Sequence, residues 1–128
     1  MKLLLDTHAF IWFIHDSPKL SNLAKSLIVN PNNECFISLA SIWEMSIKSS
    51  MGKLDIPLPI HDLYEQHIVG NDMELLPITI HHIEKVHELP FYHKDPFDRM
   101  IIAQSIVENM TIISCDSAYH DYPIHHAW

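Results

Sequence analysis

The sequence predicts an α/β fold in which helices flank a central, mainly parallel sheet. Two observations support this. Short apolar runs of strand length alternate with longer runs at helical spacing along the 128 residues. Turn residues separate the runs, and no repeat, low-complexity tract or linker interrupts them. Alternating strands and helices typically form parallel sheets, so we expect one domain over residues 1–128.

Five segments are expected to be strands because they are short and apolar and lie between turn residues. The first ends at Asp6, and the last is a short edge strand at the C-terminus. These strands are residues 3–5, 34–38, 73–78, 110–115 and 123–128.

Six segments are expected to be helices. One of them is closed by Gly52 as its C-cap. Pro57 and Pro59 mark the connection that follows it. The expected helices are residues 9–14, 20–29, 38–51, 62–69, 80–88 and 96–109. The predicted apolar face of the third consists of Ala40, Trp43, Ile47 and Met51.

Composition excludes several classes of protein. Two glycines are too few for the dinucleotide-binding fingerprint or the phosphate-binding P-loop. The net charge of −8 is unlike that of a protein that grips nucleic acid by charge alone, so a polyanionic substrate would need bound divalent cations. Cys35 and Cys115 form no C-x-x-C pair and are expected to be buried, reduced thiols of a cytoplasmic protein. The longest apolar stretch is too short to span a membrane.

Four acidic residues occupy equivalent places in this pattern. Asp6 and Asp116 directly follow strands, while Glu44 and Asp98 lie in the first turns of helices. In a parallel sheet, strand ends and the following helix starts converge on one edge, where ligands bind. Carboxylates gathered there suit Mg²⁺ or Mn²⁺, which can hold a phosphodiester and lower the pKa of a bound water.

Each acid also has a structural interpretation. Glu44 fits a capping box with Ser41 and an i,i+4 pair with Lys48. Asp95 is a natural N-cap before Pro96, which makes Asp98 a first-turn acid favoured by the helix dipole. Asp116 can cap the turn that follows it. Asp6 is different, because a carboxylate at the end of an apolar strand is costly to bury without a partner.

Several sequence segments, in order along nearly the whole chain, resemble the PIN domain family and its VapC-like toxin branch. They include Leu3-Leu4-Leu5-Asp6-Thr7-His8, Ile37-Ser38-x-x-Ser41-Ile42-Trp43-Glu44, His93-x-Asp95-Pro96-Phe97-Asp98-Arg99 and Ser114-x-Asp116. The resemblance implies a PIN-like, Rossmann-like three-layer fold. It also implies a ribonuclease whose Mg²⁺ or Mn²⁺ site matches Asp6, Glu44, Asp98 and Asp116.

The same resemblance implies a homodimer inhibited by a cognate antitoxin, with RNA as substrate. Thr7 and Asp95 are candidates for residues that orient the metal ligands without binding the metal themselves. Lys48, Lys94 and Arg99 are the candidate contacts to the RNA backbone.

Two alternatives compete with this interpretation. Eleven histidines invite a zinc site, but the ligand spacings of known zinc sites are absent; His93 is the histidine expected nearest the acidic edge. The chain could also be a catalytically silent binding module on the PIN scaffold, in which the acids only cap helices and a protein partner docks.

Overall fold

The computed structural model describes residues 1–56 and 58–128; Pro57, expected in a connection, lies outside the described residues. Five strands form one sheet in the order β3-β2-β1-β4-β5, and every neighbouring pair is parallel. The predicted parallel α/β class is therefore confirmed. The strands are β1 (Lys2–Leu5), β2 (Glu34–Ser38), β3 (Glu74–Leu76), β4 (Thr111–Ile113) and β5 (His125–Ala127).

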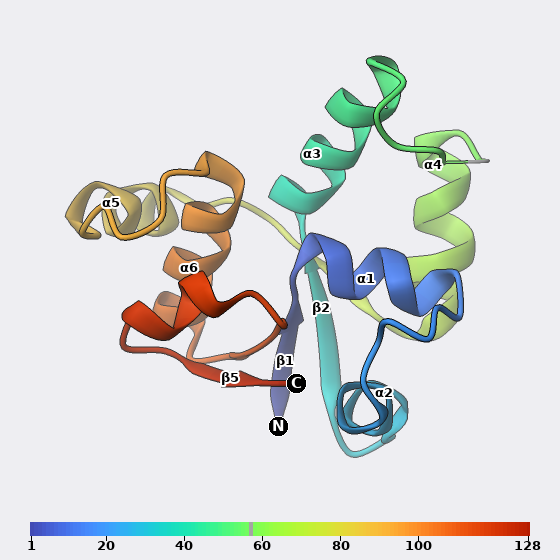
Figure 1. Cartoon of the computed structure of the whole chain (residues 1–128), viewed down its shortest axis with the longest axis horizontal. Helices are drawn as coiled ribbons and strands as arrows, with labels where there is room; N and C mark the ends of the chain where they lie inside the picture. Colours follow the sequence, from blue (N-terminus) through green and yellow to red (C-terminus); the bar gives the residue numbers. More distant parts are fainter. Residues whose placement is uncertain (57) are drawn as a thin grey trace.

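The sheet separates two apolar cores, which makes the fold three-layered. Leu3 and Leu5 of β1 point into one core, and Leu4 points into the other, as the two-residue repeat of a strand requires. The first core is covered by α1 (Thr7–Ile14), α2 (Asn22–Val29) and α4 (Ile60–Leu63). The second is covered by α5 (Ile80–Glu88) and α6 (Pro96–Glu108), which lie together on the other side in Figure 1.

Capping residues set most of the helix starts. Asp6 caps α1, Ser21 caps α2 and Asp95 caps α6, each through a side-chain oxygen that accepts a backbone N–H of the first turn. Because Asp6 binds the N–H of Ala9, α1 begins two residues earlier than the apolar run predicts. The helix after Pro59 continues from α4 through a π-helical turn at Tyr64–Ile68 and a short turn at Val69–Asn71.

Helix α3 (Leu39–Ser50) corrects two predictions. Its N-cap is Ser38, so the predicted capping box of Ser41 and Glu44 is wrong. The predicted apolar face of α3 is also wrong in part: Ala40 is buried as predicted, but Trp43 is 60% exposed. The exposed Trp43 ring instead packs edge-on against Phe97 of α6. The side chains that α3 does bury include Ile42, Met45 and the polar Ser41 and Glu44.

Local backbone chemistry closes the helices as expected. Gly52 follows α3 with a φ of +70°, a left-handed conformation that glycine adopts without steric cost. Asn109 takes the same region, at φ +53°, after α6. The prediction of two buried thiols is half right, since Cys35 is buried and Cys115 is exposed; both are free. Among the described residues, no helix is long and apolar enough to cross a membrane.

Candidate metal centre at the carboxyl edge of the sheet

The four predicted acids come from four neighbouring elements. Asp6 follows β1 and Asp116 follows β4, which is the strand paired with β1. Glu44 lies on α3, after β2, and Asp98 lies in the first turn of α6. Asp6 and Asp98 interact electrostatically, as do Asp98 and Glu44. Asp6, Glu44 and Asp98 therefore face one region at the carboxyl edge of the sheet, and Asp116 borders this region beside His93.

Asp6 is the most deeply buried carboxyl of the described chain after Glu44, with 6% of its surface exposed. Its Oδ1 accepts the N–H of Ala9 at 2.8 Å. Burial raises the pKa of Asp6 from 3.8 to about 6, although hydrogen bonding from Ser114 and Ala9 opposes the rise. Asp6 is thus both an N-cap and a carboxyl whose charged form is costly in the protein alone.

Glu44 is held from both sides. The Thr7 hydroxyl donates to its Oε1 at 2.7 Å, and the Ser41 hydroxyl lies 3.0 Å from the Thr7 oxygen. Lys48 donates to its Oε2 at 2.6 Å and forms the predicted i,i+4 ion pair. That hydrogen bond raises the pKa of Lys48. Thr7 orients Glu44 through this contact, and the charge of Glu44 is balanced within the chain.

Two side chains contact the carboxylate of Asp98. The Tyr119 hydroxyl donates to its Oδ1 at 2.9 Å, and His93 Nε2 lies 2.9 Å from its Oδ2. Burial raises the pKa of Asp98, and the neighbouring Asp95 carboxylate raises it further. Burial also raises the pKa of Tyr119 strongly, so this phenol stays protonated and remains a donor.

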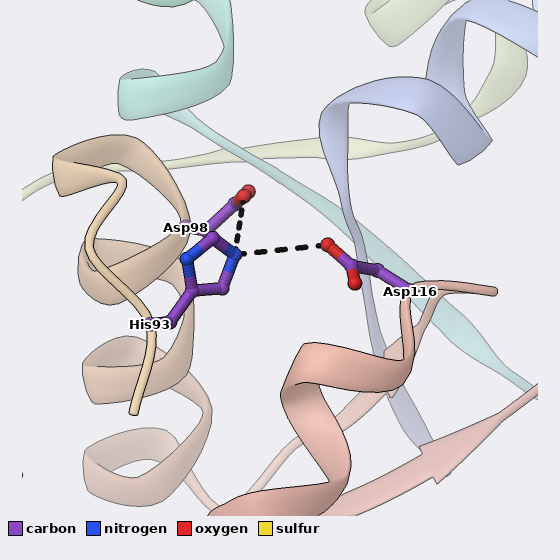
Figure 2. A group of neighbouring side chains, drawn as sticks. All are labelled: His93, Asp98 and Asp116. Carbon is purple, nitrogen blue, oxygen red and sulfur yellow. Dashed lines mark ion pairs between the residues drawn. The ribbon is translucent and has the colours of Figure 1, made fainter. Parts of the chain in front are cut away.

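Asp116 approaches the same nitrogen of His93 as Asp98 does. Its Oδ2 lies 3.6 Å from His93 Nε2, while its Oδ1 caps the following turn through the N–H of Ala118. Figure 2 shows one nitrogen of the His93 ring facing the carboxylates of both Asp98 and Asp116. One possible ligand atom from each of the three residues lies within 4.8 Å of the others.

His93 is the expected histidine at the acidic edge. Its Nε2 atom is buried, and the direction of its N–H bond does not meet any oxygen well enough for a hydrogen bond, despite the 2.9 Å approach to Asp98. Its Nδ1 accepts the N–H of Asp95 at 3.3 Å. A buried polar atom without a partner calls for an explanation.

The remaining predicted residues lie around this centre. Asp95 caps α6 by accepting the N–H groups of Phe97 and Asp98, as its structural interpretation predicts. Lys94 is exposed beside it. Arg99 is buried, with 5% of its surface exposed, and its guanidinium donates to backbone carbonyl groups. This placement does not support the expected contact between Arg99 and RNA.

Two residues of the site escaped the sequence analysis. The first is Tyr119, three residues after Asp116, whose hydroxyl donates to Asp98. The second is Ser114, whose hydroxyl oxygen accepts the N–H of Asp116 and whose side chain hydrogen-bonds Asp6. The Ser114-x-Asp116 spacing marked Ser114 only as part of a motif. Nothing in the apolar pattern around Tyr119 distinguishes its buried hydroxyl from that of an ordinary core tyrosine.

Comparisons with known proteins concern the fold and the family of the chain. No curated protein matches the sequence. The fold is similar to that of VapBC2 from Rickettsia felis bound to a promoter DNA fragment, with a TM-score of 0.74 and 17% identity over 100% of this chain and 99% of that one. It is also similar to FitAcB from Neisseria gonorrhoeae, with a TM-score of 0.69 and 17% identity over 97% and 95% of the two chains. The fold is also similar to that of a toxin–antitoxin complex from Klebsiella pneumoniae, with a TM-score of 0.64 and 16% identity over 94% of this chain and 92% of that one.

At these identities the likeness establishes the fold. The family follows from the sequence itself, because the family model described as "PIN domain" matches residues 3–124. The chain belongs to the PIN domain family.

Proposed function

We propose that this protein is a metal-dependent ribonuclease that hydrolyses phosphodiester bonds in RNA. The observation that carries the proposal is that Asp6, Glu44 and Asp98 interact electrostatically at one edge of the sheet, where Asp98 and Asp116 both approach His93. Among the described residues, Lys48 is the lysine that forms an ion pair with one of these acids. Like charges at close range are costly unless a cation lies among them. PIN domains are generally nucleases, and this chain belongs to that family.

The residues present fit a hard divalent ion. Carboxylate oxygens are the preferred ligands of Mg²⁺ and Mn²⁺, and the proposed ligands are the four acids. The buried Nε2 of His93, without a hydrogen-bond partner between Asp98 and Asp116, is a further sign that the arrangement is incomplete in the protein alone. When bound, the ion would supply charge neutralisation at the phosphate and activation of water.

The chain's own groups prepare the carboxylates for this role. Thr7 fixes one oxygen of Glu44, and Tyr119 fixes one oxygen of Asp98. Asp95 fixes the first turn of α6, so that Asp98 starts from a rigid backbone. Ligands oriented by outer hydrogen bonds bind metal more tightly than free ones, because less order is lost on binding.

Lys48 and Lys94 are the proposed contacts to the RNA backbone. Lys48 is 41% exposed at its side chain and lies against Glu44, and Lys94 is exposed next to Asp95. Backbone contacts of this kind position a nucleic acid without reading its bases. Arg99 is left out of this set because its guanidinium is buried.

We further propose that the protein is the toxin of a type II toxin–antitoxin pair, that it forms a homodimer and that a cognate antitoxin inhibits it. The support is similarity in fold to proteins from a VapBC2 assembly and from a toxin–antitoxin complex. The second candidate is a catalytically silent PIN scaffold that docks a protein partner. It is favoured by the capping contacts of Asp6, Asp95 and Asp116, each of which serves structure without any ion.

Cleavage of a mixed RNA pool in the presence of Mn²⁺ separates these candidates. The ribonuclease requires cleavage that EDTA abolishes and that Asp6→Asn strongly reduces. Asn replaces Asp well at an N-cap, so this variant keeps the fold. Equal cleavage by the Asn variant would assign the activity to a contaminant, and no cleavage by a protein that still binds a partner would favour the silent scaffold.

A further inference from the structure

The segment between α5 and α6 is anchored by two buried side chains. The guanidinium of Arg99 donates to four backbone carbonyl oxygens, and the hydroxyl of Tyr122 bonds the same segment. The Arg99 acceptors are Val86 at 3.0 Å, Leu89 at 3.2 Å, Pro90 at 2.9 Å and His93 at 3.4 Å. Tyr122 donates to the Pro90 carbonyl at 2.7 Å and accepts the N–H of His93 at 2.9 Å.

This anchoring exceeds what a surface connection needs. Arg99 is 5% exposed and Tyr122 is 4% exposed, so both bring strong polar groups into the interior to serve one short segment. The ring of Phe91 covers the guanidinium, with its centroid 4.0 Å from the central carbon. The backbone of His93 is consequently fixed at both its N–H and its carbonyl.

The side chain of His93 is fixed as well. Its Nδ1 accepts the N–H of Asp95, so a neutral ring must carry its proton on Nε2. The edge of the ring lies against Tyr119, with centroids 6.1 Å apart. The Nε2–H group is thereby fixed near both carboxylates, 2.9 Å from Asp98 Oδ2 and 3.6 Å from Asp116 Oδ2.

We propose that His93 is a positioning residue of the candidate metal centre, and that Arg99 and Tyr122 are the anchor that holds it there. The Nε2–H group faces one oxygen of each carboxylate without a formed hydrogen bond in the protein alone; in the metal-loaded site it orients both carboxylates so that their remaining lone pairs face the cation. The inference rests on the metal site of the proposed function. In this proposal Arg99 supports the site by holding the backbone of His93, and it needs no contact with RNA.

A ligand role for His93 is less consistent with the contacts. To bind an ion, Nε2 must give up its proton, and a neutral ring would then carry the proton on Nδ1. Two N–H groups, those of Nδ1 and Asp95, would face each other at 3.3 Å. Metal-bound histidines instead donate their second ring N–H to an acceptor.

Calorimetric titration of the purified protein with Mn²⁺ and with Mg²⁺ tests the proposal. His93→Ala should weaken the affinity for both ions by the same factor, about tenfold or more, which is the usual effect of losing an outer partner of a ligand. His93→Gln should recover much of the loss, because its amide N–H can occupy the place of Nε2–H. His81→Ala, which removes an exposed histidine of α5, is the matched control and should bind both ions as the parent does.

Tyr122→Phe tests the anchor with a milder change than any at Arg99. It removes only the hydroxyl that bonds Pro90 and His93, and it should weaken both affinities in the same direction as His93→Ala but by less. Thermal unfolding without metal checks that each variant is folded. Unchanged affinity in His93→Ala would overturn the proposal.

A ligand role leaves a different signature. Nitrogen ligands favour Mn²⁺ over Mg²⁺, so loss of a ligand would weaken Mn²⁺ binding far more than Mg²⁺ binding, and Gln would not restore it. That result would also overturn the positioning role. RNA cleavage is measured separately: a parent protein that binds Mn²⁺ but cleaves no RNA contradicts the proposed function, while the affinities of the variants still decide the role of His93. A parent that binds neither ion overturns both.

Discussion

The two sides of the acidic centre balance charge differently. On the α3 side, Glu44 has a hydroxyl donor on one oxygen and the ammonium of Lys48 on the other. On the α6 side, the side chains of the described residues that contact the Asp98 carboxylate are Tyr119, through its hydroxyl, and His93, through its ring. Asp116 lies close to the same ring nitrogen. The first side pairs its carboxylate with a lysine ammonium, whereas on the second side no lysine or arginine of the described residues forms an ion pair with either carboxylate.

This difference indicates where a cation is most needed. Desolvation and like charges raise the pKa of Asp98, whereas the α3 carboxylate sits beside a cation. An ion entering the centre therefore gains most from the α6 side and from the buried Asp6 beside it. The predictions below test that asymmetry.

Asp98→Asn should have the largest effect. Removing one negative ligand from the α6 side, which has no lysine in an ion pair, should reduce RNA cleavage and Mn²⁺ affinity by more than the roughly 10–100-fold that loss of an outer partner costs. Asp95→Asn is the matched control, because it removes a charge three residues away but keeps a good N-cap. Equal losses in the two variants, measured by initial cleavage rate and by titration calorimetry, would contradict the assignment of Asp98 as a ligand.

Asp6→Asn should stabilise the metal-free protein at neutral pH. The pKa of Asp6 is raised to about 6 in the folded state from 3.8, so its favourable contribution is complete below pH 3.8 and is lost as pH rises through 6. At ~1.4 kcal/mol per pKa unit, the charged carboxylate costs about 3 kcal/mol above pH 6. The variant should therefore gain up to about 3 kcal/mol in free energy of unfolding at pH 7.5 and nothing at pH 3.5.

Urea denaturation in EDTA at the two pH values measures this difference. Saturating Mn²⁺ should reduce the gain, because the ion stabilises the parent by mass action. A gain of the same size at both pH values would show that packing, and not charge, is responsible.

Metal affinity should fall as the pH is lowered. Below about pH 6 a proton competes with the ion for Asp6, so affinity should fall by about tenfold per pH unit, and the raised pKa of Asp98 adds to the competition. Mn²⁺ titrations from pH 7.5 to 4.5 provide the profile. In Asp6→Asn the profile should be flatter; a profile identical to that of the parent would exclude Asp6 from the site.

The fold was largely predictable, because it depends on local apolar periodicity. β2 and α5 begin and end at the predicted residues, since Asn and Pro residues before Glu34 and Thr79 before Ile80 define those boundaries. The face of α3 was not predictable in the same way. Trp43 is apolar, but the space beneath that part of α3 is taken by the polar contacts of Ser41 and Glu44, which no periodicity reveals.

The site was predictable only at the level of strand ends. The positions of the four acids follow from chain topology, but their partners lie far away in sequence. Tyr119 lies 21 residues from Asp98 and Thr7 lies 37 residues from Glu44, so these pairings depend on tertiary packing. Arg99 shows the opposite problem: its charge suggested RNA, and only burial revealed its backbone contacts.

Lys48→Met should have the smallest effect and is the most direct test of the charge balance on the α3 side. The ion pair is partly exposed at Lys48, so its loss should change the free energy of unfolding by less than about 1 kcal/mol. Affinity for Mn²⁺ should rise a few-fold, because the ammonium no longer competes for Glu44, while KM for RNA should rise if Lys48 contacts the backbone. Lys53→Met removes the same charge from an exposed position after α3 and should leave Mn²⁺ affinity near that of the parent. A fall in Mn²⁺ affinity confined to Lys48→Met would mean that Lys48 orients Glu44 for the ion instead of neutralising it, and the two sides of the centre would then be alike.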